Sequence, residues 1–279
     1  MMPQKSQSSD CQLNKRIIIQ NLPASVAKKL ESLQVFDVTT STNDRLMNHT
    51  PDKLGRFIAC IANQQTAGRG RNGHDWHSPA DANIYMSIAV KLDGQQMGAL
   101  NGLSLASGVS LARVFEAMGL NVGIKWPNDI LSDDKKLAGI LVETRVKARQ
   151  VLVVVGVGVN VAMPEQADEI IDQPWTDLTS LMGRDSVPDR NQLAAQLLAG
   201  LIQCLIQYIK GGFDSFAQDW KKYDLLRGRD VIIKSGEAEF SAKVLGVNND
   251  LGLKVQVNEE EKVLYAADIK LKLSGKSQR

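Results

Sequence analysis

The chain has 279 residues, of which 43% are hydrophobic and 23% charged, and its formal net charge is +2. These proportions are typical of a globular protein with a real core, and the length suits one large domain, alone or with a small one. The near-balanced charge argues against a protein built to lie along nucleic acid. Residues 1–10 are polar and unlike a secretory signal, and no run of about 18 apolar residues predicts a membrane span. We therefore expect a cytoplasmic protein.

Cysteine and histidine offer little disulfide or metal chemistry. Cys11, Cys60 and Cys204 are far apart and form no CxxC pair, so we expect reduced thiols. His74 and His77 are close in the sequence, but no Cys or carboxylate pattern completes a ligand set beside them. The sequence predicts neither a disulfide framework nor a zinc site.

The first half of the chain is expected to alternate strands and helices around one long loop. Weak apolar periodicity predicts helix between residues 13 and 33, interrupted at Pro23, and Ser41 or Thr42 suits the N-cap of a short helix. Residues 64–82 lack any periodicity, which predicts a long loop of the functional or disordered kind. Apolar runs predict strands at 35–38, 57–62, 83–92, 122–126 and 130–131, and a buried helix at 98–118.

The second half begins with two expected buried strands, at 137–145 and 151–159, and a long helix at 190–210 capped by Asp189. After Tyr223 short strand-like runs alternate with turn residues, which predicts a small β-barrel and a solvated tail at 274–279. Its strands are expected at 230–234, 240–247, 252–257, 262–265 and 269–273. We place the boundaries to give an N-terminal extension (1–34), a large domain (35–226) and a C-terminal domain (227–279).

Residues 68–73 read Gly-Arg-Gly-Arg-Asn-Gly. The glycines let the backbone approach a ligand, and Arg69 and Arg71 can contact phosphate or carboxylate oxygens with paired donors. An exposed basic turn is the simpler interpretation of this segment alone. It is neither a Walker P-loop nor a dinucleotide fingerprint, because no Gly-Lys-Ser/Thr follows and no strand–turn–helix context fits.

Two further segments place lysines at the ends of expected strands. In Lys-Trp-Pro-Asn-Asp, Lys125 can neutralise a phosphoryl group and Asp129 can hold Mg²⁺ beside phosphates. A capped turn with a surface Lys–Asp pair explains that segment somewhat better when it is taken alone. Lys136 enters a buried strand and can aim its ammonium into a cavity, although a lone lysine there usually snorkels to the surface.

The remaining two segments are uncharged. Gly156 and Gly158 alternate within a strand, which indicates either a closely approaching ligand or backbone, or ordinary tight packing, with about equal weight. Ser41, Thr42 and Asn43 can bind a polar, uncharged group, but a helix N-cap is the commoner role of such a triplet.

Together and in this order, the segments resemble the biotin protein ligase family. The match covers roughly Val35 to the C-terminus, and five ordered segments are far more specific than any one of them. The resemblance implies an α/β (α+β) fold, with a mixed-sheet biotin/lipoate-ligase-like catalytic domain followed by an SH3-like β-barrel. The strand-rich residues 230–273 agree with this independently. The matching residues are Ser41–Asn43, Gln65 with Gly68–Gly73 and Trp76, Lys125–Asp129, Lys136–Glu143 and Gly156–Asn160.

The resemblance also implies an activity: ATP activates biotin as biotinyl-AMP, and the biotinyl group passes to a lysine of a biotin carboxyl carrier domain. It implies Mg²⁺, held by Asp129, and no tightly bound prosthetic group. The catalytic residues it implies are Arg71, Lys136 and Asp129. The biotin site it implies comprises Ser41, Thr42, Asn43, Gln65, Arg69, Gly70, Arg71, Lys136, Gly139, Gly156 and Gly158. The ATP site it implies comprises Arg71, Lys125, Asn128, Asp129, Lys136, Asn160, Trp175 and Arg190.

The sequence departs from the family pattern in two places. Regulatory members carry an N-terminal winged helix-turn-helix, whereas about forty residues precede Ser41 here and show no such pattern. We therefore expect no repressor function and no specific DNA. His74 stands where members often have a basic residue, which would weaken one nucleotide contact. We also expect part of residues 66–78 to be disordered without ligand, because the loop lacks apolar anchors.

Three other hypotheses remain open at this stage. A lipoate protein ligase resembles the fold, but the Gly-Arg-Gly-Arg-Asn-Gly segment and the terminal barrel favour biotin. A biotin-responsive DNA-binding repressor lacks its expected N-terminal pattern here. The presence of Arg71, Lys136 and Asp129 argues against a binding protein without catalysis. We expect a monomer or a weak homodimer.

Overall fold

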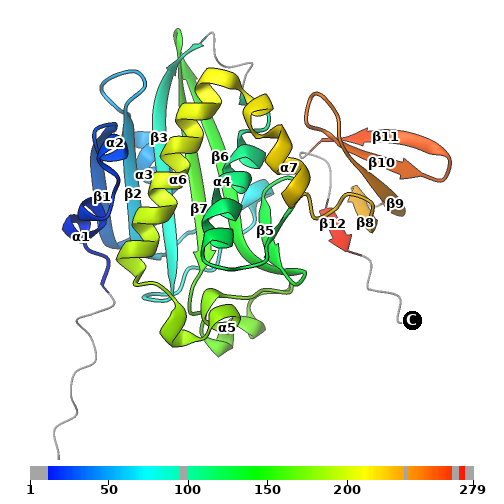
Figure 1. Ribbon diagram of the computed structural model, residues 1–279, viewed down its shortest axis with the longest axis horizontal. Helices are drawn as coiled ribbons and strands as arrows, with labels where there is room; N and C mark the ends of the chain where they lie inside the picture. Colours follow the sequence, from blue (N-terminus) through cyan, green and yellow to red (C-terminus); the bar gives the residue numbers. More distant parts are fainter. Residues whose placement is uncertain (1–11, 95–99, 236–237, 266–269, 274–279) are drawn as a thin grey trace, which may run out of the picture.

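The structure is a computed structural model and describes residues 12–94, 100–235, 238–265 and 270–273. A large domain is built on a seven-stranded mixed sheet, and a C-terminal domain on a five-stranded antiparallel sheet (Figure 1). The predicted fold class, a mixed-sheet α/β domain followed by a small β domain, is confirmed.

The seven-stranded sheet has the order β1-β2-β3-β7-β6-β5-β4. Its first two strands are parallel and the other neighbouring pairs are antiparallel. The middle strands are covered on both faces, which explains their continuous apolar runs. The strands are β1 (Leu30–Thr39), β2 (Phe57–Gln65), β3 (Asn83–Asp93), β4 (Gly123–Lys125), β5 (Asp129–Ser132), β6 (Lys135–Lys147) and β7 (Gln150–Asn160).

Helices cover both faces of this sheet. The long helices α4 (Leu103–Ala117) and α6 (Arg190–Gly211) lie against one face, over the main core (Figure 1). The short helix α3 (Thr42–Asn48) lies against the other, over a smaller apolar cluster. The remaining α-helices are α1 (Lys15–Gln20), α2 (Ala24–Ala27), α5 (Leu178–Met182) and α7 (Ala217–Tyr223), and the 3₁₀ turns include Arg71–Gly73 and Glu165–Glu169.

Two helices begin at the predicted caps. The Ser41 hydroxyl accepts from the Asp44 N–H (3.4 Å) at the start of α3, and the Asp189 carboxylate accepts from the Asn191 N–H (2.8 Å) at the start of α6. Among the described residues, α6 is the one helix long and apolar enough to cross a membrane. Most of its apolar window is buried within the protein, 61%, so it serves here as a core helix.

The N-terminal segment is helical over less of its length than the predicted region 13–33, which was expected to be interrupted at Pro23. It forms α1 and α2, separated at Pro23, and β1 already begins at Leu30. Ile18 and Val26 are buried in the main core, so packing and strand pairing override the weak helical periodicity. The boundary between residues 34 and 35 stays a prediction, and β1 crosses it.

Smaller differences concern element ends. α4 begins at Leu103, later than the predicted residue 98, after Gly102 with φ +84°. The predicted strand at 122–126 is confined to β4. α5 and α7 were not predicted, because five and seven residues are too short to show a period. Cys11, residues 98–99, residue 269 and the tail at 274–279 lie outside the described residues.

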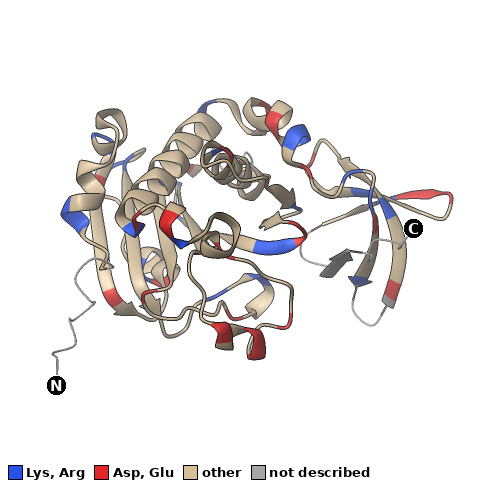
Figure 2. Cartoon of the chain, turned by 60° about the horizontal axis from the view of Figure 1, so that its bottom comes forward, with Lys and Arg blue, Asp and Glu red and all other residues tan. Residues whose placement is uncertain are grey.

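The C-terminal sheet has the order β11-β10-β9-β8-β12, and its strands fall where short runs were predicted. It meets the large domain where the Trp126 indole N–H donates to the Leu251 carbonyl (3.0 Å). A groove of about 470 Å³, whose lining includes Arg71 and Tyr265, lies at this junction. Lys and Arg are interleaved with Asp and Glu over both domains (Figure 2). The strands are β8 (Asp230–Ser235), β9 (Ala238–Val247), β10 (Leu253–Val257), β11 (Glu260–Leu264) and β12 (Lys270–Leu273).

Candidate active site

The sheet brings two of the predicted lysine segments together around one carboxylate. Asp129 begins β5, and Lys125 ends β4 directly opposite it. Lys136 lies near the start of β6, the next strand, with its Nζ 2.9 Å from an Asp129 carboxylate oxygen. Both side chains of this pair are mostly buried, at 16% and 15% exposed. We call Arg71, Lys125, Asp129 and Lys136 the cationic cluster.

Arg71 joins this cluster from the segment 68–73, which we call the glycine-rich loop. Its guanidinium donates to the Asn128 side-chain oxygen (3.4 Å). Burial lowers the pKa of Arg71, and the nearby Asp129 carboxylate opposes that shift. Burial likewise lowers the pKa of Lys125; Asp129 opposes this shift, and the like charge of Lys136 adds to it. Three cations around one carboxylate favour the binding of an anion such as phosphate.

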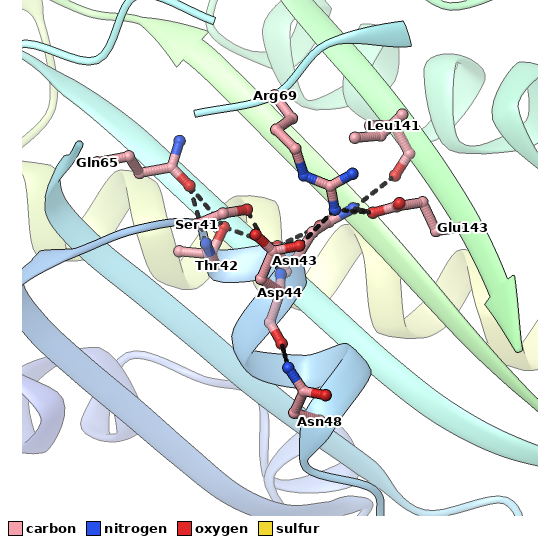
Figure 3. A network of polar contacts seen from close by, with 10 residues as sticks. Ser41, Thr42, Asn43, Asp44, Asn48, Gln65, Arg69, Leu141 and Glu143 are labelled. Atoms are coloured by element: carbon pink, nitrogen blue, oxygen red, sulfur yellow. Dashed lines mark hydrogen bonds and ion pairs between the residues drawn. The ribbon is translucent and has the colours of Figure 1, made fainter. Parts of the chain in front are cut away.

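Uncharged polar groups meet a short distance along the sheet. The Gln65 side-chain oxygen accepts from the Thr42 N–H (2.9 Å) and lies 3.2 Å from the Thr42 hydroxyl. The Asn43 amide donates to Glu143 (2.8 Å) (Figure 3). The Ser87 hydroxyl on β3 lies 2.7 Å from the Thr42 hydroxyl and 2.5 Å from the Asn43 oxygen. We call Thr42, Asn43, Gln65 and Ser87 the neutral cluster.

Gly139, Gly156 and Gly158, three of the predicted glycines, lie on one face of β6 and β7, where they leave a strip of the sheet without side chains. We call these three residues the glycine strip. Gly139 and Gly158 are directly opposite each other in the ladder, and Gly156 faces the same way two residues along. A Cβ on Gly156 would lie 2.2 Å from the Asn43 oxygen, and one on Gly158 would lie 2.3 Å from the Trp76 indole. The side chains of Asn43 and Trp76, which belong to the site, therefore occupy the space that the glycines leave open.

Trp76 connects this strip to the cationic cluster. The Lys136 ammonium lies 5.1 Å from the centre of the Trp76 indole, a cation–π distance. The buried indole N–H groups of Trp76 and Trp175 have no hydrogen-bond partner among the described residues. Because buried donors are nearly always paired, the Trp76 N–H favours a ligand acceptor near Lys136, and the Trp175 N–H favours an acceptor of its own.

Asn160 and Trp175 lie beside Lys136, whereas Arg190 is held elsewhere. The Asn160 amide donates to the carbonyls of Lys136 (3.3 Å) and Thr176 (3.0 Å), and Trp175 forms a β-bridge with Lys136. The buried Arg190 donates to the Asn83 carbonyl (2.7 Å), at the start of β3. Its predicted contact with phosphates stays a prediction.

The glycine-rich loop folds back on itself. The Gly70 N–H donates to the His74 carbonyl (2.6 Å), and the Trp76 N–H donates to the Gly68 carbonyl (2.9 Å). Gly68 is required at its position, because a Cβ there would lie 2.6 Å from the Trp76 carbonyl oxygen. His74 is exposed. The predicted disorder of the loop without ligand stays a prediction.

Sequence reasoning assigned no role to three residues that contact the predicted site. Ser87 is fully buried, and Glu143 and Asp44 both bind the Arg69 guanidinium, at 2.9 and 2.5 Å. A signal for Ser87 was available, because a serine interrupts the apolar run of β3 and buried polar groups need partners. Ser41 is the opposite case, since its side chain serves the common role of an N-cap.

Comparisons with known proteins agree with this geometry. The Biotin/lipoate A/B protein ligase family matches residues 35–160. The Bifunctional ligase/repressor BirA of Salmonella typhimurium is 35% identical over 246 residues, which cover 86% of this chain and 74% of that protein. The Biotin–[acetyl-CoA-carboxylase] ligase of Mycobacterium tuberculosis is 35% identical over 224 residues, covering 78% of this chain and 79% of that one.

Solved structures extend the likeness to the fold. The biotin protein ligase of Aquifex aeolicus in complex with biotin and ATP matches with a TM-score of 0.71 and 27% identity, covering 88% of this chain and all of that one. The family match over residues 35–160 includes all the residues of the cationic and neutral clusters. The chain therefore belongs to the biotin protein ligases of the biotin/lipoate A/B protein ligase family.

Proposed function

We propose that this protein is an ATP-dependent biotin protein ligase, which forms biotinyl-AMP and transfers the biotinyl group to a lysine of a biotin carboxyl carrier domain. The proposal rests mainly on one observation: the neutral cluster and the cationic cluster lie next to each other, on either side of the glycine strip. The neutral cluster suits the uncharged ureido ring of biotin. The cationic cluster suits a carboxylate and a polyphosphate, and Lys136 and Trp76 connect the two.

In the first half-reaction a biotin carboxylate oxygen attacks the α-phosphorus of ATP, and the bond to the leaving pyrophosphate breaks. Both reactants are anions, so their approach is opposed by charge repulsion. Arg71 and Lys136 neutralise that charge, and Lys125 adds to the positive field. Asp129 holds the Lys136 ammonium in place through their 2.9 Å ion pair.

In the second half-reaction the amine nitrogen of the carrier lysine attacks the acyl carbon, and AMP leaves. The attacking amine has to lose a proton, and we assign its acceptance or orientation to Asp129. The groove lined by Arg71 and Tyr265 gives one approach to the cationic cluster.

A metal ion at this site would need ligands from the nucleotide phosphates in addition to those of the protein. The described residues contain no group of three His, Cys, Asp or Glu side chains that could hold an ion. Asp129 is a single carboxylate, which fits the way Mg²⁺ is usually held in nucleotide sites, by one or two carboxylates and substrate phosphates. Bound there, Mg²⁺ would supply further neutralisation of phosphate charge.

The first test is exchange of labelled pyrophosphate into ATP, with biotin and with lipoate as separate substrates. We expect exchange with biotin and little with lipoate. Exchange with lipoate alone would move the chain to the lipoate ligases, and exchange with neither would overturn adenylation. Transfer of labelled biotin to a purified carrier domain tests the second half-reaction.

We further propose that the chain does not bind specific DNA. Opposite charges are interleaved over both domains (Figure 2), and α1 packs on the large domain, where the Asn14 N–H donates to Asn191 (2.6 Å). A gel shift at physiological salt with a biotin-operon operator tests this, and a specific complex would restore the repressor hypothesis.

We also propose that the protein is located in the cytoplasm and that it is a monomer or a weak homodimer. Cys60 and Cys204 are buried free thiols, and burial raises the pKa of each to about 12, which keeps them unreactive. Cell fractionation and sedimentation across a concentration series test these two statements.

A further inference from the structure

Glu143 is bonded to two separate parts of the site. One of its carboxylate oxygens accepts from the Asn43 amide (2.8 Å) and from the Arg69 guanidinium (2.9 Å) (Figure 3). Asn43 belongs to α3, Arg69 to the glycine-rich loop and Glu143 to β6. A single oxygen therefore joins three chain segments that are distant in sequence.

The first of these bonds is the shorter of two that fix the direction of the Asn43 amide, since its NH₂ group also donates to the Leu141 carbonyl (3.5 Å) (Figure 3). A carboxylate only accepts hydrogen bonds, so the NH₂ end of the amide must face Glu143. The amide oxygen then faces the Ser87 hydroxyl and Gly156, where a glycine is needed to admit it. That oxygen keeps a lone pair, which suits a ligand N–H such as those of a urea and does not suit an apolar dithiolane ring.

The second bond anchors the loop. Arg69 binds Glu143 and Asp44 on one side of the site, while Arg71 reaches Asn128 at the cationic cluster. Arg69 and Asp44 are about 40% exposed, so solvent weakens their ion pair. Glu143, at 24% exposed, is the more sheltered of the two partners.

We propose that Glu143 is a positioning and specificity-determining residue, which sets the direction of the Asn43 amide and anchors the glycine-rich loop through Arg69. The inference rests on the proposed function for the identity of the ligand. It assigns to one carboxylate both the preference for a ligand with N–H groups and the position in which the loop is held.

Steady-state pyrophosphate exchange tests the first role, with KM measured separately for biotin and for ATP. Glu143→Ala should raise KM for biotin about tenfold or more, because it removes two charge-assisted hydrogen bonds. KM for ATP should change by less than about twofold. A purely structural role would instead lower the active fraction and leave both KM values unchanged.

Two further variants separate the effects of the Glu143–Asn43 and Glu143–Arg69 hydrogen bonds on KM for biotin. Glu143→Gln keeps an acceptor for Asn43 but loses the ion pair with Arg69, so KM for biotin should rise only about threefold. Asp44→Asn weakens the loop anchor alone and should have a similar or smaller effect. Glu261→Gln, which removes an exposed partner of Lys254 on the C-terminal sheet, is the matched charge control and should behave as wild type.

Amide hydrogen exchange of the protein without substrates tests the anchor independently of activity. Residues 68–77 should exchange faster in Glu143→Ala than in wild type or Glu261→Gln. If wild type shows no biotin-dependent pyrophosphate exchange, the proposed function is overturned, and loop protection still decides the anchor. An unchanged KM for biotin together with unchanged loop protection in Glu143→Ala would overturn this inference.

Discussion

The two clusters of the site satisfy their polar groups in different ways. In the neutral cluster, Thr42, Asn43, Gln65 and Ser87 bond to one another or to Glu143, so each has a protein partner. In the cationic cluster, cations outnumber the carboxylate, and burial lowers the pKa of both Arg71 and Lys125. Every member of the neutral cluster has a protein partner, whereas the four members of the cationic cluster carry a net positive charge.

This difference assigns different tasks to the two clusters. Satisfied, oriented dipoles add affinity and selectivity for a neutral group, but their interactions change little during a reaction. A net positive charge stabilises a state in which negative charge gathers between two anions, which is the transition state of adenylation. Changes in the cationic cluster should therefore reduce the rate, and changes in the neutral cluster should mainly reduce the affinity for biotin.

The largest effect is expected from Lys136→Ala. It removes a cation from the point where the two substrates meet, and kcat/KM for biotin-dependent pyrophosphate exchange should fall about 10²–10³-fold. Lys136→Arg, which keeps the charge beside Asp129, should lose less. Circular dichroism checks that both variants are folded. A Lys136→Ala enzyme within tenfold of wild type would contradict the division of tasks.

The next effect lies in the neutral cluster. In Gly156→Ala the new methyl group would lie 2.2 Å from the Asn43 oxygen, so Asn43 must move. KM for biotin should rise about tenfold or more, while KM for ATP stays near its wild-type value. Adding Asn43→Ala removes the clash, so a double-mutant cycle should show strong coupling between the two positions. Additive effects would contradict the contact.

The two clusters also differ in how far the sequence predicts them. The glycine, lysine and Ser-Thr-Asn segments could be predicted because each is short and contiguous. Ser87 and Glu143 could not be placed, because their role depends on strand register. Ser87 is opposite Gly156 in the β3–β7 ladder, and local periodicity does not contain this pairing.

Burial and strand pairing also explain which elements of the fold could be predicted from the sequence. Strands such as β3 and β7 were predicted nearly to their ends, because burial on both faces requires long apolar runs. The N-terminal segment has helices on both sides of Pro23, as predicted, but the predicted helical region extended too far, to residue 33. Local periodicity does not show that β1 pairs with β2 from Leu30 onward. Arg190 shows the limit for site residues, since its tertiary partners include a backbone carbonyl of β3, which no local pattern predicts.

A smaller effect, on stability, is expected from Lys125→Met. Burial lowers the pKa of Lys125 in the folded protein, so holding the charged amine costs folding free energy at any pH below that pKa. The variant should be more stable than wild type by about 1 kcal/mol at pH 7, although less active. The gain should shrink as pH rises through the folded pKa, since wild-type Lys125 is then neutral. Urea unfolding between pH 7 and 10 measures this, and a constant or growing difference would contradict it.

The smallest effect is expected from Thr42→Val. The Thr42 hydroxyl lies between Gln65 and Ser87, but each of these keeps another partner: Gln65 still accepts from the Thr42 N–H, and Ser87 can still donate to Asn43. Because no buried group is left unpaired, KM for biotin should rise only about threefold, and Thr42→Ser should match wild type. A loss above about a hundredfold would mean that the hydroxyl bonds directly to the ligand in the transition state, and the neutral cluster would then share the task assigned to the cationic one.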